Sequence, residues 1–60
     1  MSEQITVCIA DNDEDYRRWL ERELGSADDI RIAASVSDGR QALAAVEQHR
    51  PQVLLLDPML

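Results

Sequence analysis

Two apolar runs in this chain each lead directly into an aspartate. The run 5–10 ends at Asp11, and the run 53–56 ends at Asp57. Nearly continuous aliphatic character is typical of a β-strand that is covered on both faces. If both runs are strands of one parallel sheet, their carboxyl ends lie at the same edge, which is where open α/β sheets place their chemistry. The two aspartates are therefore the first candidates for a functional site.

Between the two runs the pattern changes to helix, strand and helix. Tyr16, Trp19, Leu20 and Leu24 fall at the spacing of one helical face, and this spacing predicts that the face, including its aromatic rings, packs on the core. Gly25 is expected to end this helix in the usual way, as a C-terminal glycine.

The segment 30–36 alternates apolar with polar or small residues, which predicts an edge strand with one covered face. A second helix is expected to be capped by Asp38, with Gln41 as the reciprocal partner of a capping box, and to end at Pro51. The apolar face of this helix is predicted to consist of Ala42, Leu43 and Val46.

The resulting order is β-α-β-α-β, and right-handed crossovers make the sheet parallel. The alternating strand belongs at an edge and the two continuous runs belong inside, so the spatial order 2-1-3 is favoured. This order places the strands that end in Asp11 and Asp57 side by side, about 4.8 Å apart. The predicted fold class is α/β, half of a doubly wound parallel sheet, in one domain spanning residues 1–60.

Composition limits what such a domain can do. Its 60 residues allow one small domain of marginal stability. The only cysteine, Cys8, lies within an apolar run and reads as a small buried hydrophobe, compatible with a reducing, cytoplasmic setting. The net charge of -6 argues against a nucleic-acid partner. No apolar stretch approaches the roughly 18 residues of a membrane span, so no membrane partner is expected.

Carboxylates that converge on one edge favour a cation. Mg²⁺ prefers one or two carboxylates together with several waters, and an aspartate beside such an ion can accept a phosphoryl group. The simpler alternative is that Asn12 or Asp13 caps the first helix and that Asp11 is a solvated loop residue. For Asn12 itself the cap is the favoured interpretation. Asp57 is harder to dismiss, because a carboxylate that ends a buried strand needs a partner or a cation.

Four segments in order resemble the N-terminal half of a bacterial two-component response-regulator receiver domain, whose fold is flavodoxin-like. They are ITVCIADND, YRRWLERELG, SVSDGRQAL and RPQVLLLDPML, and together they cover essentially the whole chain. The resemblance implies that Asp57 is the phosphoacceptor, and that Asp11, Asn12, Asp57 and the backbone carbonyl of Met59 hold Mg²⁺. Asn12 stands where the family usually has a carboxylate, which should weaken metal binding unless Asp13 substitutes.

The implied function is that of a phosphoacceptor module, not an enzyme, which takes a phosphoryl group from a sensor histidine kinase or a phosphotransfer protein. By the same resemblance, it belongs to a cytoplasmic transcriptional regulator. The family completes its fold with further strands and helices that bring a Ser or Thr switch residue and a lysine. This chain has no lysine, so we expect a truncated receiver. In such a receiver the 53–56 strand is an exposed edge, and self-association through it is predicted.

Two other functions stay open. Strand-Asp11-x-Asp13 also resembles the first motif of the haloacid-dehalogenase superfamily, in which Asp11 would be the nucleophile of a phosphatase. Against it, Asp15 replaces that family's hydroxyl residue, and no Ser or Thr closes the 53–57 strand. The third possibility is a receiver-like interaction segment that is not phosphorylated and acts through its exposed edge. The substitution Asp57→Asn separates the three functions. It should abolish phosphoryl labelling of a receiver, spare the labelling of a phosphatase that uses Asp11, and have no effect on an interaction segment that is not phosphorylated.

Overall fold

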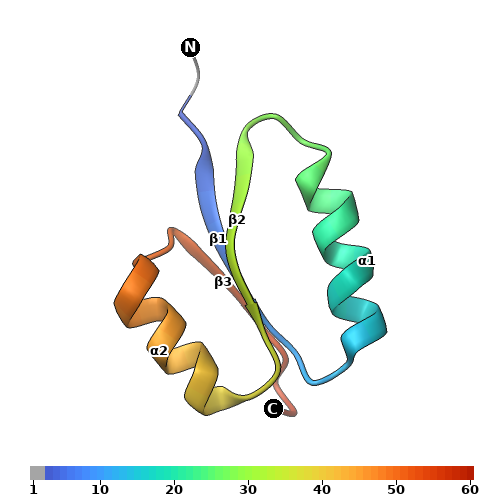
Figure 1. Cartoon of the computed structure of the whole chain (residues 1–60), viewed down its shortest axis with the longest axis vertical. Helices are drawn as coiled ribbons and strands as arrows, with labels where there is room; N and C mark the ends of the chain where they lie inside the picture. The colour runs from blue at the N-terminus through green and yellow to red at the C-terminus, as the bar shows by residue number, and fades with distance from the viewer. Residues whose placement is uncertain (1–2) are drawn as a thin grey trace.

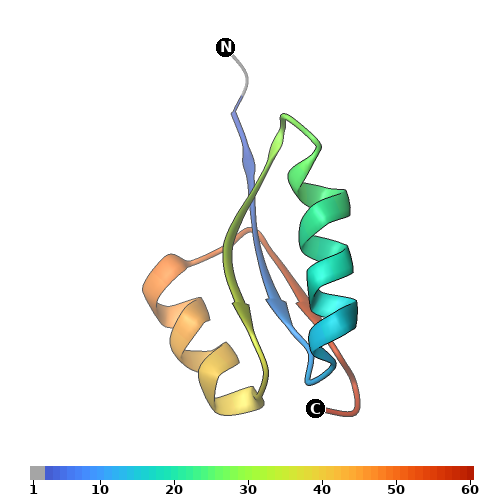
Figure 2. The ribbon, with the colours of Figure 1, turned by 45° about the vertical axis from the view of Figure 1, so that its right-hand side comes forward.

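The structure, a computed structural model that describes residues 3–60, contains a three-stranded sheet with one helix on each side (Figure 1). All strands are parallel and their order is β2-β1-β3, as predicted. Figure 2 shows that the two helices lie on opposite sides of the sheet, as the doubly wound arrangement requires. The elements are β1 (Ile5–Ala10), α1 (Glu14–Gly25), β2 (Ile30–Val36), α2 (Gly39–His49) and β3 (Val53–Leu56).

Strand β1 lies at the centre of the sheet and pairs with both other strands. Its second half runs in register with the whole of β3, from Val7 opposite Val53 to Ala10 opposite Leu56. On the other side, β2 carries one extra residue, Ala33, because the register shifts between Val7 and Cys8. This irregularity interrupts the alternation that the sequence predicted for the segment 30–36, where Arg31 is exposed and the other residues are half-buried.

The core is small and centres on β1. Ile9 and Ala10 are 0% exposed, and α2 contributes two buried alanines to the same core. α1 packs mainly against β2 and has no fully buried residue, whereas α2 packs against β1 and β2. Neither helix has its main contacts on β3, which explains the exposure described below. The buried hydrophobic residues are Val7, Cys8, Ile9, Ala10, Ala42 and Ala45.

Three apolar side chains that the helical periodicity assigned to the core are exposed instead. Tyr16 and Trp19 are 46% and 50% exposed, and their rings stack on each other with centroids 6.0 Å apart. Leu43 of α2 is 63% exposed, because Ala42 and Ala45 take the inward positions. Tyr16 and Leu43 each line an open hollow beside β3. The prediction was wrong because α1 packs mainly on β2 and α2 on β1 and β2, so neither helix covers β3.

The aliphatic character of β3 alone predicted an interior strand, but the structure confirms the expectation that 53–56 is an exposed edge strand. Its four residues are all exposed, by between 37% and 54%. An aliphatic run of this kind is typical of a strand with neighbours on both sides. Among residues 3–60, β3 has a neighbouring strand only at β1, so it is an edge strand of the described sheet.

Helix ends differ from the sequence expectations in two places. Asp13, not Asn12, is the N-cap of α1, and its side chain accepts a hydrogen bond from the Tyr16 N–H at 3.1 Å. Gly25 is the last residue of α1, but no described glycine has positive φ. A left-handed C-cap is found at the end of the other helix, α2, at Arg50, with φ of 45°, directly before Pro51.

The capping box of α2 is present in a modified form. Asp38 accepts from the Gln41 N–H at 2.8 Å, as predicted. The Gln41 side chain accepts from the N–H of Ser37 at 3.0 Å. In the standard box it would accept from the N–H of the cap residue itself, which is Asp38. Within residues 3–60, no helix has the length and apolar character needed to cross a membrane.

Candidate functional site

Backbone hydrogen bonds hold Asp11 and Asp57 at the carboxyl edge of the sheet. The Asp11 N–H donates to the carbonyl of Val36 at 3.1 Å, and the Asp57 N–H donates to the carbonyl of Ala10 at 2.9 Å. Each aspartate therefore continues the ladder by one residue beyond the end of its strand. This arrangement follows from the strand order, since β2, β1 and β3 all end at this edge.

The two aspartates line the same cavity, which has a volume of about 460 Å³. Both side chains are half-buried. Aliphatic and aromatic residues from β1, α1 and β3, together with Pro58, form the rest of its walls, so among residues 3–60 the two carboxylates are the acidic groups that line it. The lining consists of Ile9, Asp11, Tyr16, Leu20, Leu55, Leu56, Asp57 and Pro58.

Each aspartate uses one carboxylate oxygen to fix the loop that follows it. Oδ1 of Asp11 accepts from the Asp13 N–H at 2.9 Å, and Oδ1 of Asp57 accepts from the Met59 N–H at 3.0 Å. These are Asx turns, in which the aspartate side chain accepts from the backbone N–H two residues ahead. No residue of the described chain, 3–60, donates to either Oδ2, so one oxygen of each carboxylate is available to a ligand.

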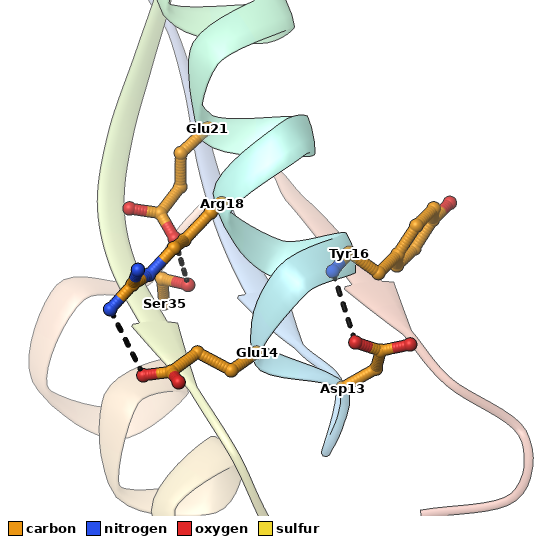
Figure 3. A network of polar contacts seen from close by, with 6 residues as sticks. All are labelled: Asp13, Glu14, Tyr16, Arg18, Glu21 and Ser35. Carbon is orange, nitrogen blue, oxygen red and sulfur yellow. Dashed lines mark hydrogen bonds and ion pairs between the residues drawn. The ribbon is translucent and has the colours of Figure 1, made fainter.

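Asp13 is committed to capping α1. Figure 3 shows its carboxylate beneath the first turn of α1, bonded to the backbone of Tyr16. On the other side of the helix, Glu21 accepts from the hydroxyl of Ser35 at 2.9 Å, which ties α1 to β2 (Figure 3). Asp13 does not line the cavity, so it would have to release the helix to act as a substitute ligand.

The other predicted metal ligands lie outside the cavity lining. Asn12 is exposed, and Met59 is 85% exposed. The backbone of Met59 is nevertheless held next to Asp57 by the hydrogen bond described above. The structure thus brings Asp11 and Asp57 together, and it leaves Asn12 and Asp13 at the rim formed by the first loop.

Sequence reasoning missed one wall of the cavity. Tyr16 was assigned to the core, but its ring stands beside Asp11 and Asp57, stacked on Trp19 at an interplanar angle of 21°. Leu20 joins it one turn later on α1. The helical spacing of these residues was visible in the sequence. The sequence did not show that α1 packs mainly on β2, which leaves the face that carries Tyr16 and Leu20 open.

The donor set at this edge suits a hard divalent cation. Two carboxylates share the cavity, and none of the six basic residues, all arginines, lines it. Mg²⁺ is commonly held by one or two carboxylates and keeps several waters, so the number of carboxylates is sufficient. Among residues 3–60, no group of three or more His, Cys, Asp or Glu side chains is placed to hold a metal ion. Any ion here would therefore rely on water and backbone oxygens for its remaining ligands.

Comparison with known proteins gives distant relatives. A protein-glutamate methylesterase/protein-glutamine glutaminase 2 of Nitratidesulfovibrio vulgaris is 34% identical over 53 residues, which is 88% of this chain but 14% of that protein. A protein-glutamate methylesterase/protein-glutamine glutaminase of Nitrosospira multiformis is also 34% identical over 53 residues, or 15% of its length. The chain thus spans about one seventh of these relatives. No family model matches the chain, and no solved structure matches it.

Proposed function

We propose that this chain supplies the phosphoacceptor edge of a receiver-type signalling module, with Asp57 as the acceptor. The observation that carries the proposal is the shared cavity of Asp11 and Asp57 at the carboxyl edge of a parallel sheet. The similarity to two methylesterases supports the proposal only coarsely, because it covers 14% and 15% of their lengths and is compatible with a receiver-like segment.

In the proposed reaction, the free carboxylate oxygen of Asp57 attacks the phosphorus of a phosphohistidine. The new bond is O–P, the broken bond is the P–N bond of the donor, and the imidazole leaves with its electron pair. The product is an acyl phosphate on Asp57. Two hydrogen bonds support this role for Asp57: its N–H donates to the carbonyl of Ala10 at 2.9 Å, which holds its backbone, and its Oδ1 accepts from the Met59 N–H at 3.0 Å, which orients its carboxylate. The donor is a histidine kinase or a phosphotransfer protein.

Mg²⁺ would neutralise the charge that develops on the transferring group. Asp11 would hold it through its free carboxylate oxygen, and Asp57 through the oxygen that also accepts from the Met59 N–H, with the backbone carbonyl of Met59 as a further ligand. The amide of Asn12 is neutral, so it contributes less attraction than the carboxylate that the receiver family usually carries there. We therefore expect weak Mg²⁺ binding at this site.

The phosphatase alternative is less well supported. It needs Asp11 as a nucleophile and Asp13 as its neighbour in the site, but Asp13 caps α1 and lies outside the cavity lining. It also gives no role to Asp57, which shares the cavity with Asp11. The shared cavity therefore favours Asp57 as the acceptor and Asp11 as a metal ligand.

The test is an amide NMR titration of the chain with Mg²⁺ and then beryllofluoride, an analogue of the phosphoryl group. We expect shifts at Asp11, Asp57 and Met59 that require both additions and that disappear in Asp57→Asn. Glu47→Gln is the matched control, because it removes one negative charge at an exposed position of α2. It should keep the full response.

Two outcomes would contradict the proposal. One is a well-dispersed spectrum that does not respond to beryllofluoride, since the fold would then be intact without a phosphoryl site. The other is a response that survives in Asp57→Asn and is lost in Asp11→Asn, which would make Asp11 the nucleophile.

A further inference from the structure

We propose that Asp13 is a positioning residue for Asp11. It ties the Asp11 carboxylate to the first turn of α1, so that cation binding at Asp11 and the cap of α1 stabilise each other. Asp13 itself lies outside the lining of the cavity and is not a ligand of the ion. This proposal rests on the phosphoacceptor function proposed above, because it concerns a carboxylate that would hold the ion of that site.

A continuous series of hydrogen bonds leads from the sheet to α1 through the loop that follows β1. The Asp11 N–H donates to the carbonyl of Val36 at 3.1 Å, and Oδ1 of Asp11 accepts from the Asp13 N–H at 2.9 Å. Oδ1 of Asp13 accepts from the Tyr16 N–H at 3.1 Å, and the Asp13 carbonyl accepts from the Arg17 N–H at 3.0 Å. Asp13 is thus bonded to Asp11 on one side and to the helix on the other.

The cap fixes the backbone of Asp13 in the conformation that this series requires. Asp13 is the N-cap of α1, with φ of -88° and ψ of 107°, which is the extended conformation typical of that position. Figure 3 shows its carboxylate beneath the first turn of the helix. The capping bond satisfies one of the N–H groups that have no partner within the helix. Without it the first turn is free to fray, and the Asp13 N–H is no longer held against Asp11.

The bond from Asp13 leaves Asp11 with one free carboxylate oxygen. In the part of the chain that the structure describes, no residue donates to Oδ2 of Asp11. Mg²⁺ is well suited to a single oxygen, because it demands near-octahedral geometry and keeps several waters. Ca²⁺ is larger and often takes both oxygens of a carboxylate, which here would break the bond from the Asp13 N–H. The loop therefore favours the small ion, which leaves the cap intact.

The ion ligand and the cap share one hydrogen bond, so their stabilities are linked. An ion on Oδ2 restricts the Asp11 side chain, and a restricted side chain holds the Asp13 N–H more firmly. By reciprocity, losing the cap weakens ion binding by the same factor by which the ion strengthens the cap. Truncating an N-cap typically changes the helix equilibrium by about fivefold, which sets the upper limit of this coupling.

Amide hydrogen exchange tests the connection without any metal ion. Asp11→Ala removes the acceptor of the Asp13 N–H and should speed exchange at the Tyr16 amide severalfold. Asp11→Asn is the matched control, because it removes the same charge but keeps a side-chain oxygen that can accept this bond. It should exchange as the wild type does. The amide of Ile9, in the buried centre of β1, is used to correct for changes in global stability.

Mg²⁺ and Ca²⁺ titrations followed by amide NMR test the effect on the ion. Asp13→Asn removes the charge but keeps a capping side chain, whereas Asp13→Ala removes both. We expect Asp13→Ala to bind Mg²⁺ about three- to fivefold more weakly than Asp13→Asn. The ratio of Ca²⁺ to Mg²⁺ affinity should rise in Asp13→Ala, because a loosened loop frees the second oxygen of Asp11. A purely structural loss would weaken both ions alike. Asp15→Asn, at an exposed position of the first turn, measures the effect of charge alone.

Two results would overturn this proposal alone. Equal exchange at Tyr16 in Asp11→Ala and Asp11→Asn would show that the loop does not connect Asp11 to the cap. Equal Mg²⁺ affinities of Asp13→Asn and Asp13→Ala would show that the cap has no effect on the ion, and if both variants had lost binding, Asp13 would be a ligand.

The phosphoacceptor function fails in a different way. A wild-type chain that binds Mg²⁺ but does not respond to beryllofluoride would contradict that function and leave the coupling between Asp13 and the ion in place. A folded wild-type chain that shows no response to Mg²⁺ would overturn both proposals.

Discussion

β1 and β3 lie side by side in one sheet, and both are aliphatic strands that lead into an aspartate, yet only β1 has buried residues. Cys8, Ile9 and Ala10 are at most 1% exposed, whereas the four residues of β3 are 37% to 54% exposed. β1 has a strand on each side and α2 against it; β3 has its main contacts with β1 alone. Position in the sheet, rather than the character of the strand, decides how much each run contributes to stability.

The largest expected difference between the two strands comes from truncating one side chain in each. Ile9→Ala removes a fully buried side chain and should lower the free energy of unfolding by about 2–5 kcal/mol. This approaches the roughly 3–9 kcal/mol that a domain of this length has in total. Leu55→Ala should cost only about 1 kcal/mol, because Leu55 is already 37% exposed.

Urea unfolding followed by circular dichroism measures both values. It must be done at a chain concentration at which sedimentation shows monomers, because association adds apparent stability. Equal losses for Ile9→Ala and Leu55→Ala in the monomer would mean that β3 is as well covered as β1, and the comparison between the strands would fail.

The next largest effect concerns the helix that packs on β1. Asp38 caps α2 by accepting from the Gln41 N–H at 2.8 Å. Asp38→Ala should therefore destabilise the fold by about 1 kcal/mol, measured by thermal unfolding, and Asp38→Ser should restore most of the loss because serine is also a good cap. If serine and alanine behave alike, the cap is not what holds α2 against the sheet.

A smaller effect tests the connection between β1 and β3 directly. The N–H of Thr6 donates to the side-chain oxygen of Gln52 at 3.0 Å, and the backbone N–H of Gln52 donates to the carbonyl of Thr6 at 2.9 Å. Gln52→Ala should cost about 0.5–1 kcal/mol and should speed hydrogen exchange at the Thr6 amide. Gln48→Ala, at an exposed position on α2, is the matched control. Equal exchange rates in the two variants would show that the Gln52 side chain does not hold β3.

The features that could be predicted from the sequence are those set by local chemistry. Strand and helix order, the strand order 2-1-3 and the Asp38 cap follow from periodicity, from capping preference and from the handedness of crossovers. The meeting of Asp11 and Asp57 follows from the strand order, because both stand one residue past a strand end.

The features that could not be predicted depend on what lies beneath each helix. Helical spacing shows which face of α1 is apolar, but not that α1 sits over β2 and leaves Tyr16 and Trp19 half-exposed. The sequence offered both Asn12 and Asp13 as caps of α1, and it did not decide between them. Asn12 and Asp13 are both good caps, and the choice falls on Asp13, whose own N–H is held by the carboxylate of Asp11 at 2.9 Å.

The smallest expected effect provides a baseline for the comparison of the two strands. Arg18 and Glu14 form an ion pair at 3.3 Å on the surface of α1, with side chains 67% and 65% exposed. Solvent screening limits such a pair, so Arg18→Ala should cost no more than about 0.3–0.5 kcal/mol, and 1 M salt should reduce the difference further. The measurement is thermal unfolding at low and high salt. A loss as large as that of Leu55→Ala would mean that surface charge on α1 matters as much as β3 does, and the contrast between a stabilising centre and a weakly contributing edge would then need a different cause.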